Sequence, residues 1–404
     1  NDVSVICFMR ERAYVRYRWL DIRLQKVVPE LMRREKIDMW VIIAREYNED
    51  PVIKTMLPAT WLAARRRTIL VFFDRGQEVE MLAIARYNVG RHFKSAWNPE
   101  QQPDQWQRLA EIIAERNPQK IAINYSQTFA LGDGISHSEF ESFKAALPAS
   151  ARAKIVSGEK LAIGWLERRI AEEMEVYPTI CEIAHKIIAE GFSNAVIQPG
   201  VTTTDDVVWW YRERIRALKL VTWFHPSVSI QRANDEEHAG DFSSRPGAKV
   251  IRRGDLLHVD FGITYLGLNT DTQQHAYVLK HGETEAPADL KKALATGNRL
   301  QDILMSHFVE GRSGNEILAK SLAQAKAEGI VPSIYTHPIG FHGHAAGPTI
   351  GLWDQQGGVP GRGDYPLYRN TAHSIELNVT VPIDEWGDKK IRIMLEEDAI
   401  FTES

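Results

Sequence analysis

Hydrophobic and polar positions alternate with two different periods along the first 150 residues. Apolar side chains recur at helical spacing in residues 18–37 and 105–115, which predicts two helices. Compact apolar runs predict buried strands at residues 38–43, 68–73, 79–85 and 120–124. Residues 74–77, Asp-Arg-Gly-Gln, have the composition of a turn between the middle two strands. This order of elements predicts an α/β domain.

Helical periodicity returns in residues 161–197, and we expect a break near Pro178 because proline has no N–H to donate. Thr203 and its neighbours predict the N-cap of the helix that follows. Two more helices are expected at residues 289–305 and 314–328.

Apolar runs around Asp260 and Tyr277 predict paired strands, with Gly262 and Gly267 marking the turn between them. Strands and helices alternate in blocks through this half of the chain, which is typical of an α+β domain. We therefore expect two domains, at residues 1–160 and 161–404.

Four carboxylates and one imidazole are candidate metal ligands in the second domain: Asp260, Asp271, His337, Glu376 and Glu396. Isolated Asp and Glu residues are mostly solvated. Asp260, however, interrupts an apolar run, and Glu376 lies between Ile375 and Leu377. A carboxylate on a buried strand needs a partner, because burying an uncompensated charge is costly. Such a ligand set can hold two divalent ions about 3.5–4 Å apart with a bridging water.

The local strings around these residues resemble the metallopeptidase family with the pita-bread fold, which includes methionine aminopeptidase, prolidase, aminopeptidase P and creatinase. The similarity covers roughly Leu166 to the end of the chain. Four features carry it: Val-Asp-Phe-Gly at residues 259–262, Asp271 eleven residues after Asp260, His-Pro-Ile-Gly at residues 337–340 with His344 seven residues after His337, and Glu396 with Glu403.

The resemblance implies an α/β N-terminal domain, an α+β pita-bread catalytic domain and two divalent metal ions. Asp260 would bind one metal, Asp271 and Glu396 would bridge both, and His337 and Glu376 would complete the ligand set of the second metal. Glu376 would also accept a proton from the bridging water to give hydroxide, and His344 would stabilise the oxyanion. Mn²⁺ is the first expectation, with Co²⁺, Zn²⁺ and Fe²⁺ as alternatives, because carboxylate-rich coordination with one imidazole suits all of them.

Family members also have a histidine before the first metal-binding Asp, which holds substrate or relays protons. His238, 22 residues before Asp260, is the candidate here, and residues 242–250 resemble a loop insertion between the two. His225 is its competitor. The other nearby histidines have no family role and are interpreted as neighbours of the site: His258, His275 and His342.

The surroundings of the ligands depart from the prolidase and aminopeptidase P pattern. Gln-Gln-His at residues 273–275 replaces a common Thr-Arg-Thr string, and Met394 replaces a common Arg, with Arg392 nearby. Ala345 and Leu377 replace a common acidic residue and a common Pro. These departures argue against a strict Xaa-Pro dipeptidase. Residues 351–368, rich in Gly and Pro, either cover the mouth of the pocket or form a plain surface loop.

Composition limits the classes of partner and compartment that are compatible with this chain. The net charge of −4 argues against a nucleic-acid surface, and the Arg-Arg-Arg run at residues 65–67 is interpreted as a local solvated stretch. No apolar run approaches the roughly 20 residues of a membrane span. Cys7 and Cys181 provide neither a disulfide framework nor a thiolate metal site. The first residue is Asn rather than Met, so a removed secretion signal, and with it the compartment, stays open.

The resemblance thus implies a metal-dependent hydrolase of peptide bonds, an Xaa-Pro aminopeptidase or dipeptidase-like exopeptidase acting on small peptides as a homodimer. Hydrolysis of a non-peptide amide or ester is an alternative. A metal-free amidinohydrolase like creatinase and a non-catalytic binding protein are further alternatives. Relatives of those two kinds have lost ligands, and an intact carboxylate cage without metals would be destabilised by repulsion.

Overall fold

The computed structural model of the chain describes residues 6–234 and 248–402. These residues form two compact units that join in sequence between Glu172 and Glu173. Each unit has its own sheets and its own core, and we call them the N-terminal and the C-terminal unit. Within the described residues, no helix is long and apolar enough to cross a membrane.

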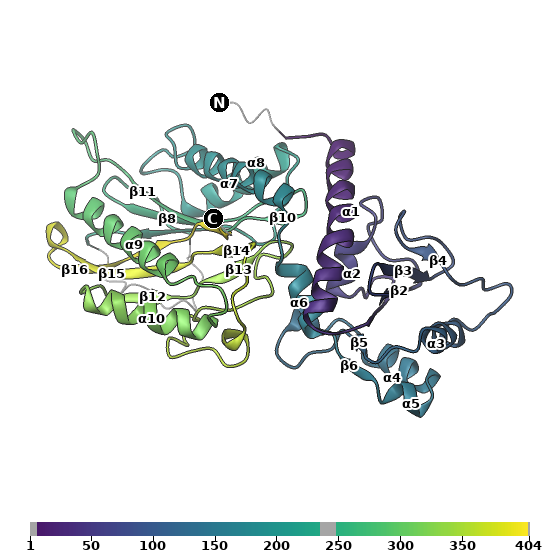
Figure 1. Cartoon of the computed structure of the whole chain (residues 1–404). Coiled ribbons are helices and arrows are strands. Elements are labelled where there is room, and N and C mark those ends of the chain that lie inside the picture. Colours follow the sequence, from purple (N-terminus) through teal and green to yellow (C-terminus); the bar gives the residue numbers. More distant parts are fainter. Residues whose placement is uncertain (1–5, 235–247, 403–404) are drawn as a thin grey trace. The chain divides into compact units, whose positions relative to one another are not determined.

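A six-stranded mixed sheet is the centre of the N-terminal unit, with the strand order β4-β3-β2-β1-β5-β6 (Figure 1). Its strands are β1 (Met39–Arg45), β2 (Arg67–Asp74), β3 (Val79–Ile84), β4 (Lys94–Ser95), β5 (Ile121–Ile123) and β6 (Ile155–Ser157). The strand β1 is antiparallel to β2 and parallel to β5. The four strands predicted from compact apolar runs are confirmed by β1, β2, β3 and β5.

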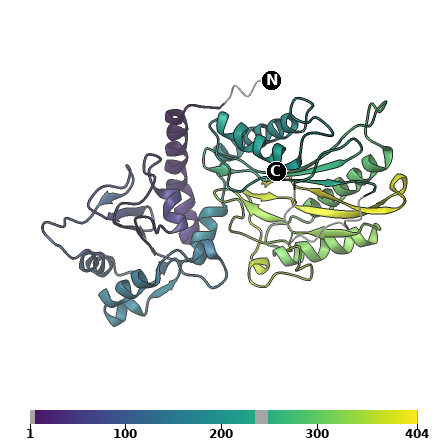
Figure 2. The same ribbon diagram turned by 180° about the vertical axis from the view of Figure 1, so that it is seen from behind.

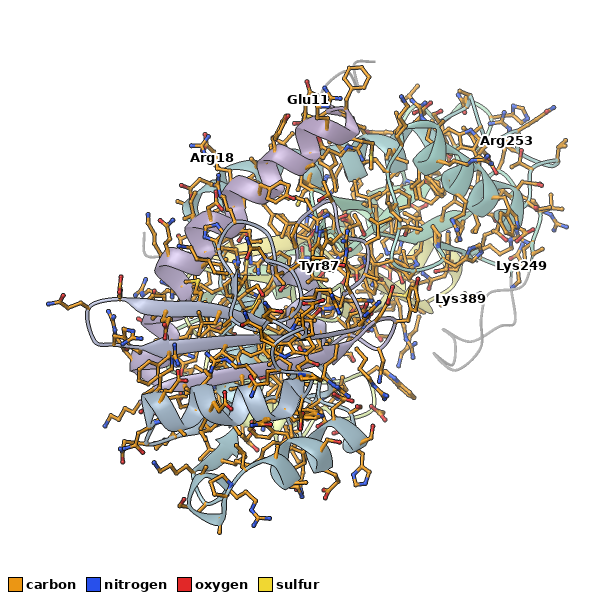
Figure 3. The ribbon with its side chains drawn as sticks, turned by 90° about the vertical axis from the view of Figure 1, so that its right-hand side faces the viewer. Glu11, Arg18, Tyr87, Lys249, Arg253 and Lys389 are labelled. Carbon is orange, nitrogen blue, oxygen red and sulfur yellow. The ribbon has the colours of Figure 1, made fainter. Side chains whose placement is uncertain are left out.

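The helices of this unit are α1 (Met9–Arg34), α2 (Pro51–Met56), α3 (Gln105–Arg116), α4 (His137–Ala146), α5 (Ala149–Arg152) and α6 (Glu159–Glu167), with the short 3₁₀ helix η1 (Ala130–Gly132). Helix α1 begins nine residues earlier than its apolar periodicity predicts. Its first turn is exposed and is closed by Glu11, whose Oε2 accepts a 2.8 Å hydrogen bond from the Phe8 N–H. Glu11 and Arg18 point away from the helix (Figure 3).

The arginine run next to β2 has structural partners. Arg67 forms an ion pair with the buried Glu139, with 2.5 Å between Nε and Oε2. The guanidinium of Arg65 lies 4.5 Å from the centre of the Trp61 ring. These contacts within the unit account for two of the three arginines without a phosphate ligand.

The C-terminal unit contains three-stranded sheets with the orders β11-β8-β7, β12-β15-β16 and β13-β14-β17 and the two-stranded sheet β10-β9. The strands before residue 300 are β7 (Ser227–Gln231), β8 (Leu256–Phe261), β9 (Thr264–Tyr265), β10 (Leu268–Asn269) and β11 (Thr272–Tyr277). The later strands are β12 (Pro332–Ile334), β13 (His337–Ile339), β14 (Thr371–Ser374), β15 (Leu377–Ile383), β16 (Lys389–Leu395) and β17 (Asp398–Phe401). The predicted pairing of the strands around Asp260 and Tyr277 is confirmed by β8 and β11.

Four long helices belong to this unit: α7 (Ala171–Gly191), α8 (Thr204–Ala217), α9 (Ala288–Ser306) and α10 (Gly314–Ala327). The strands lie between the pair α7 and α8 and the pair α9 and α10, as both views show (Figures 1 and 2). Helices α9 and α10 share an apolar core with β12, β15 and β16. The short 3₁₀ helices η2 (Arg362–Asp364) and η3 (Asp384–Trp386) lie in the connections between later strands.

The expected break at Pro178 is wrong, because Pro178 lies inside α7. The helical segment is instead interrupted at residues 168–170, between α6 and α7. Proline removes one helical hydrogen bond, but Tyr177, Ile180 and Ile183 on the same helix are buried. Packing of this apolar face maintains the helix. The predicted cap at Thr203 is confirmed, since its hydroxyl accepts from the Asp206 N–H at 3.1 Å.

Candidate metal centre

The five predicted ligands lie on strands or at the ends of strands in the C-terminal unit. Asp260 is on β8, and His337 is the first residue of β13. Asp271 directly precedes β11, Glu376 lies between β14 and β15, and Glu396 directly follows β16.

Strand pairing brings these positions together. Gln273 on β11 is opposite Asp260 on β8, and Gln273 also forms an isolated bridge with Glu396. In a second sheet, His337 is opposite Ser374, two residues before Glu376. Five residues from Asp260 to Glu396, which are far apart in the sequence, therefore lie at one place.

Three groups of side chains could each hold a metal ion, with ligand atoms within 4.8 Å of one another. They are Asp260 with Asp271 and Glu396, His337 with Glu376 and Glu396, and Asp271 with His337 and His344. The first two groups share Glu396, and the first and third share Asp271. This arrangement is compatible with bridging roles for Asp271 and Glu396, which stay predictions.

Buried atoms without hydrogen-bond partners show that the site suits a cation. Asp260 Oδ1, Asp271 Oδ1 and His337 Nε2 are buried and make no hydrogen bond within the described part of the chain. Buried polar atoms are nearly always paired. All three atoms are the ligand type that divalent first-row metals bind, so the residues fit the implied metal ions.

The backbone of the next residue orients the ring of His337. His337 Nδ1 lies 2.9 Å from the carbonyl oxygen of Pro338, which can only accept, so Nδ1 carries the proton. Nε2 then faces the carboxylates, 3.3 Å from Glu396 Oε1 and 3.6 Å from Asp271 Oδ2. A metal ion bound at Nε2 would replace a proton there and leave the Nδ1–H in place.

Electrostatics without a cation are unfavourable at this site. Burial and the charge of Glu396 raise the pKa of Asp260 to about 8, and they raise the pKa values of Asp271 and Glu376 well above the usual range. Burial lowers the pKa of His337, but Glu396 and Glu376 outweigh it and raise this pKa to about 9. Mutual repulsion of buried carboxylates therefore has to be relieved by protons or by a cation.

A second layer of residues, whose part in the site the sequence analysis did not identify, holds the carboxylates. Gln273 Nε2 lies 2.7 Å from Glu376 Oε1 and 2.8 Å from Glu396 Oε2. Ser374 Oγ donates to Glu396 Oε1 at 2.7 Å. The Asp271 N–H donates to Asp398 Oδ2 at 3.2 Å. Only Gln273 had a signal in the sequence, as a departure from the family string.

His344 lies at the exposed side of the cluster. Its ring is perpendicular to that of His337, with 4.8 Å between the ring centres, and 5.1 Å from the Trp223 ring. A Cβ atom on Gly343 would lie 2.3 Å from Trp223, so glycine allows this close approach. Burial, His337 and Arg362 lower the pKa of His344 to about 4. The imidazole is therefore neutral at neutral pH.

The other candidate histidines differ in where they lie relative to the ligand cluster. His225 is exposed, 3.0 Å from Arg212 Nη1 and against Trp209, and belongs to none of the ligand groups found in the described residues. His275 is partly buried and accepts from the Met394 N–H at 2.9 Å. His238 lies outside the described residues, so its role stays a prediction.

Residues 351–368 are tied to the unit by side-chain hydrogen bonds. Asn315 on α10 accepts from the Val359 N–H at 2.7 Å and donates to Asp364 Oδ1 at 2.8 Å. Gln356 accepts from the Ile334 N–H and donates to the Ile334 carbonyl. The segment thereby carries Arg362 close enough to His344 to act on its pKa.

Known proteins were compared with the chain at the level of sequence families and of structures. A sequence model of the family described as Metallopeptidase family M24 matches residues 179–403, more than half of the chain. No curated protein matches the chain.

Several solved structures share the fold over nearly the whole chain. An X-Pro aminopeptidase from Thermotoga maritima MSB8 is 16% identical, with a TM-score of 0.62 over 93% of this chain and 95% of that one. A putative aminopeptidase P from Bacillus anthracis is 11% identical, with a TM-score of 0.63 over 96% and 93%. A prolidase from Pyrococcus furiosus is 16% identical, with a TM-score of 0.57 over 93% and 96%.

These similarities confirm the expected fold class, an α/β N-terminal unit followed by a pita-bread unit. The family implies divalent metal ions, and the ligand groups described above are where the chain can bind them. The protein belongs to metallopeptidase family M24 and is a peptidase of the pita-bread fold.

Proposed function

We propose that the chain removes residues from small peptides at a dinuclear metal site, with Xaa-Pro bonds as the first substrates to test. The observation that carries the proposal is the convergence of four carboxylates and one imidazole around buried atoms that have no hydrogen-bond partner in the described residues. Asp260, Asp271 and Glu396 would hold one ion, and His337, Glu376 and Glu396 the other. Bound divalent ions would acidify a water molecule and polarise the scissile carbonyl.

Glu376 has the position of a proton carrier. Its side chain is 19% exposed, whereas those of Asp271 and Glu396 are 5% and 1% exposed. A carboxylate that substrate and water can reach can take a proton and pass it on, and Glu376 is more exposed than Asp271 and Glu396. In this proposal Glu376 takes the proton of the attacking water and delivers it to the leaving amine.

His344 supports the same reaction from the open side of the cluster. A neutral imidazole has one N–H to donate, and it carries no charge that would repel a cation bound at His337. Donation of this N–H to the carbonyl oxygen as it becomes negative stabilises the transition state. The low pKa of His344 supports this role, because the ring stays neutral over the working pH range.

Arg362 supports a short substrate with a free carboxylate. It is exposed on the tied segment of residues 351–368, and its charge acts on His344. A guanidinium pairs well with the carboxylate of a peptide that ends close to the scissile bond. In this proposal Arg362 provides the positive charge that an arginine at the position of Met394 provides in the family pattern.

Metal identity and assembly belong to the same proposal. Oxygen-rich coordination with one imidazole suits Mn²⁺ first, with Co²⁺, Zn²⁺ and Fe²⁺ as alternatives. A homodimer is proposed on the family resemblance alone, and light scattering of the purified protein tests it directly.

The experiment is product analysis by mass spectrometry on a mixed library of short peptides. Protein loaded with Mn²⁺, Co²⁺ or Zn²⁺ is compared with Asp271→Ala and Glu376→Ala, and with Asp302→Ala, an exposed residue of α9, as a matched control. We expect release of residues that precede proline by the wild type and Asp302→Ala only. Turnover by Asp271→Ala would contradict the site, and no cleavage of any peptide by the wild type with any of the three metals would contradict the substrate.

A further inference from the structure

Gln273 joins two metal-ligand carboxylates to a buried histidine. Its side-chain nitrogen contacts Glu376 Oε1 and Glu396 Oε2, and its side-chain oxygen lies 2.8 Å from His258 Nε2. Gln273 and His258 are both buried. The Gln273 backbone N–H also donates to the Glu396 carbonyl at 3.1 Å. The residue is therefore attached to Glu396 through both its backbone and its side chain.

Chemistry determines the direction of each hydrogen bond in this chain. The amide NH₂ of Gln273 donates to Glu376 and Glu396, which can only accept once they are ionised around a cation. The amide oxygen then faces His258, and because it also only accepts, His258 Nε2 must carry the proton. His258 Nδ1 is left to accept from Ser229 Oγ, 3.4 Å away. All these hydrogen bonds therefore point the same way. Ser229 donates to His258, His258 donates to Gln273, and Gln273 donates to the two carboxylates.

We infer that Gln273, oriented by His258, is a positioning residue that holds Glu376 and Glu396 together and sets the affinity of the ion bound by His337, Glu376 and Glu396. An amide with two donors brings two like charges close without adding a charge of its own. It occupies one oxygen of each carboxylate and leaves Glu376 Oε2 and Glu396 Oε1 facing His337, at 3.8 and 3.3 Å. The inference rests on the proposed dinuclear site.

The neighbouring residue provides a matched comparison. Gln274 also donates its side-chain amide to a glutamate, Glu397, which is not among the proposed ligands. Successive side chains on a strand point to opposite faces, so Gln273 and Gln274 share strand and chemistry but not the metal cluster. A general need for glutamine on β11 predicts equal effects at both positions, whereas the positioning role predicts an effect at Gln273 alone.

The test is calorimetric titration of the full-length, chelator-treated protein with Mn²⁺ and with Co²⁺, accompanied by the visible spectrum of bound Co²⁺. We expect the wild type to bind two ions and Gln273→Met to bind one of them about 10–100-fold more weakly. The Co²⁺ spectrum of this variant should also change. Gln274→Met should titrate like the wild type.

Two substitutions at His258 keep the test valid if Gln273→Met fails to fold. His258→Leu removes the donor that orients the amide, and His258→Gln retains an N–H at a similar reach. We expect His258→Leu to weaken the same ion and His258→Gln to restore its affinity, with unchanged circular dichroism in both.

The outcomes separate the two claims. A wild type that takes up a single ion overturns the dinuclear proposal. A wild type with two ions whose Gln273→Met and His258→Leu variants bind both with unchanged affinity overturns the role of Gln273 only.

Discussion

Ser374 Oγ donates a 2.7 Å hydrogen bond to Glu396 Oε1, and both side chains are buried. The second oxygen of Glu396 accepts from Gln273 at 2.8 Å. Both oxygens of this carboxylate therefore have donors, whereas Asp260 and Asp271 each have an oxygen without one in the described residues. Glu396, common to two ligand groups, is the carboxylate that the protein itself supports most fully.

Ser374→Ala should lower the free energy of unfolding by about 1–3 kcal/mol, because a buried charged group loses a donor. Denaturant unfolding of the metal-free protein measures this change. Ser321→Ala is the matched control, since Ser321 is equally buried but bonds only the Ile317 carbonyl of its own helix. Equal effects of the two substitutions would show that Ser374 does no more than fill space.

Metal-free protein should lose stability as pH rises from about 7 to 9, above the range in which the histidines of lowered pKa, such as His258 and His344, titrate in the unfolded chain. The pKa of Asp260 is raised to about 8, those of Asp271 and Glu376 are raised well above their usual range, and that of His337 is raised to about 9. The folded state thus binds more protons than the unfolded state in this window, and stability falls as these protons are lost. Thermal melts across the pH series measure the fall.

Metal ions should reverse this dependence, because a bound cation replaces the protons and binds only the folded state. The Tm measured with excess Mn²⁺ should be higher than that of the metal-free protein, and the difference should be largest at high pH. A metal-free Tm that stays flat from pH 7 to 9 would show that the carboxylates do not repel one another as the structure implies.

His344→Ala should reduce kcat by about 10²–10³-fold with a smaller change in KM, since the N–H acts on charge that develops in the transition state. His281→Ala, an exposed histidine, is the control. Because the pKa of His344 is about 4, its titration should not appear in the pH–rate profile between pH 6 and 8. An unchanged kcat would exclude His344 from the reaction.

Arg362→Met should raise KM for dipeptides roughly tenfold while leaving kcat nearly constant, because a charged hydrogen bond to the substrate is lost. The matched substrates are the same dipeptides with an amidated C-terminus. Their KM should be high with the wild type and unaffected by the substitution. An equal loss for both substrate forms would place Arg362 away from the substrate carboxylate.

Much of the fold follows from local pattern. The strands β1 and β2 were predictable because continuous apolar runs have no place except a buried sheet. The cap at Thr203 was predictable because it depends on neighbouring residues alone. The break at Pro178 was not, because packing of the buried face of α7 outweighs the hydrogen bond that proline removes.

The sequence by itself determined the five candidate ligands, since each lies in a short string whose order along the chain carries the resemblance. Only the tertiary structure decided what surrounds them. Gln273 looked like a loss from the family string, yet strand register places its amide between Glu376 and Glu396. His225 looked like a competitor for the site, yet it packs against Trp209 on the surface. Such contacts join residues far apart in the chain, and local patterns carry no information about them.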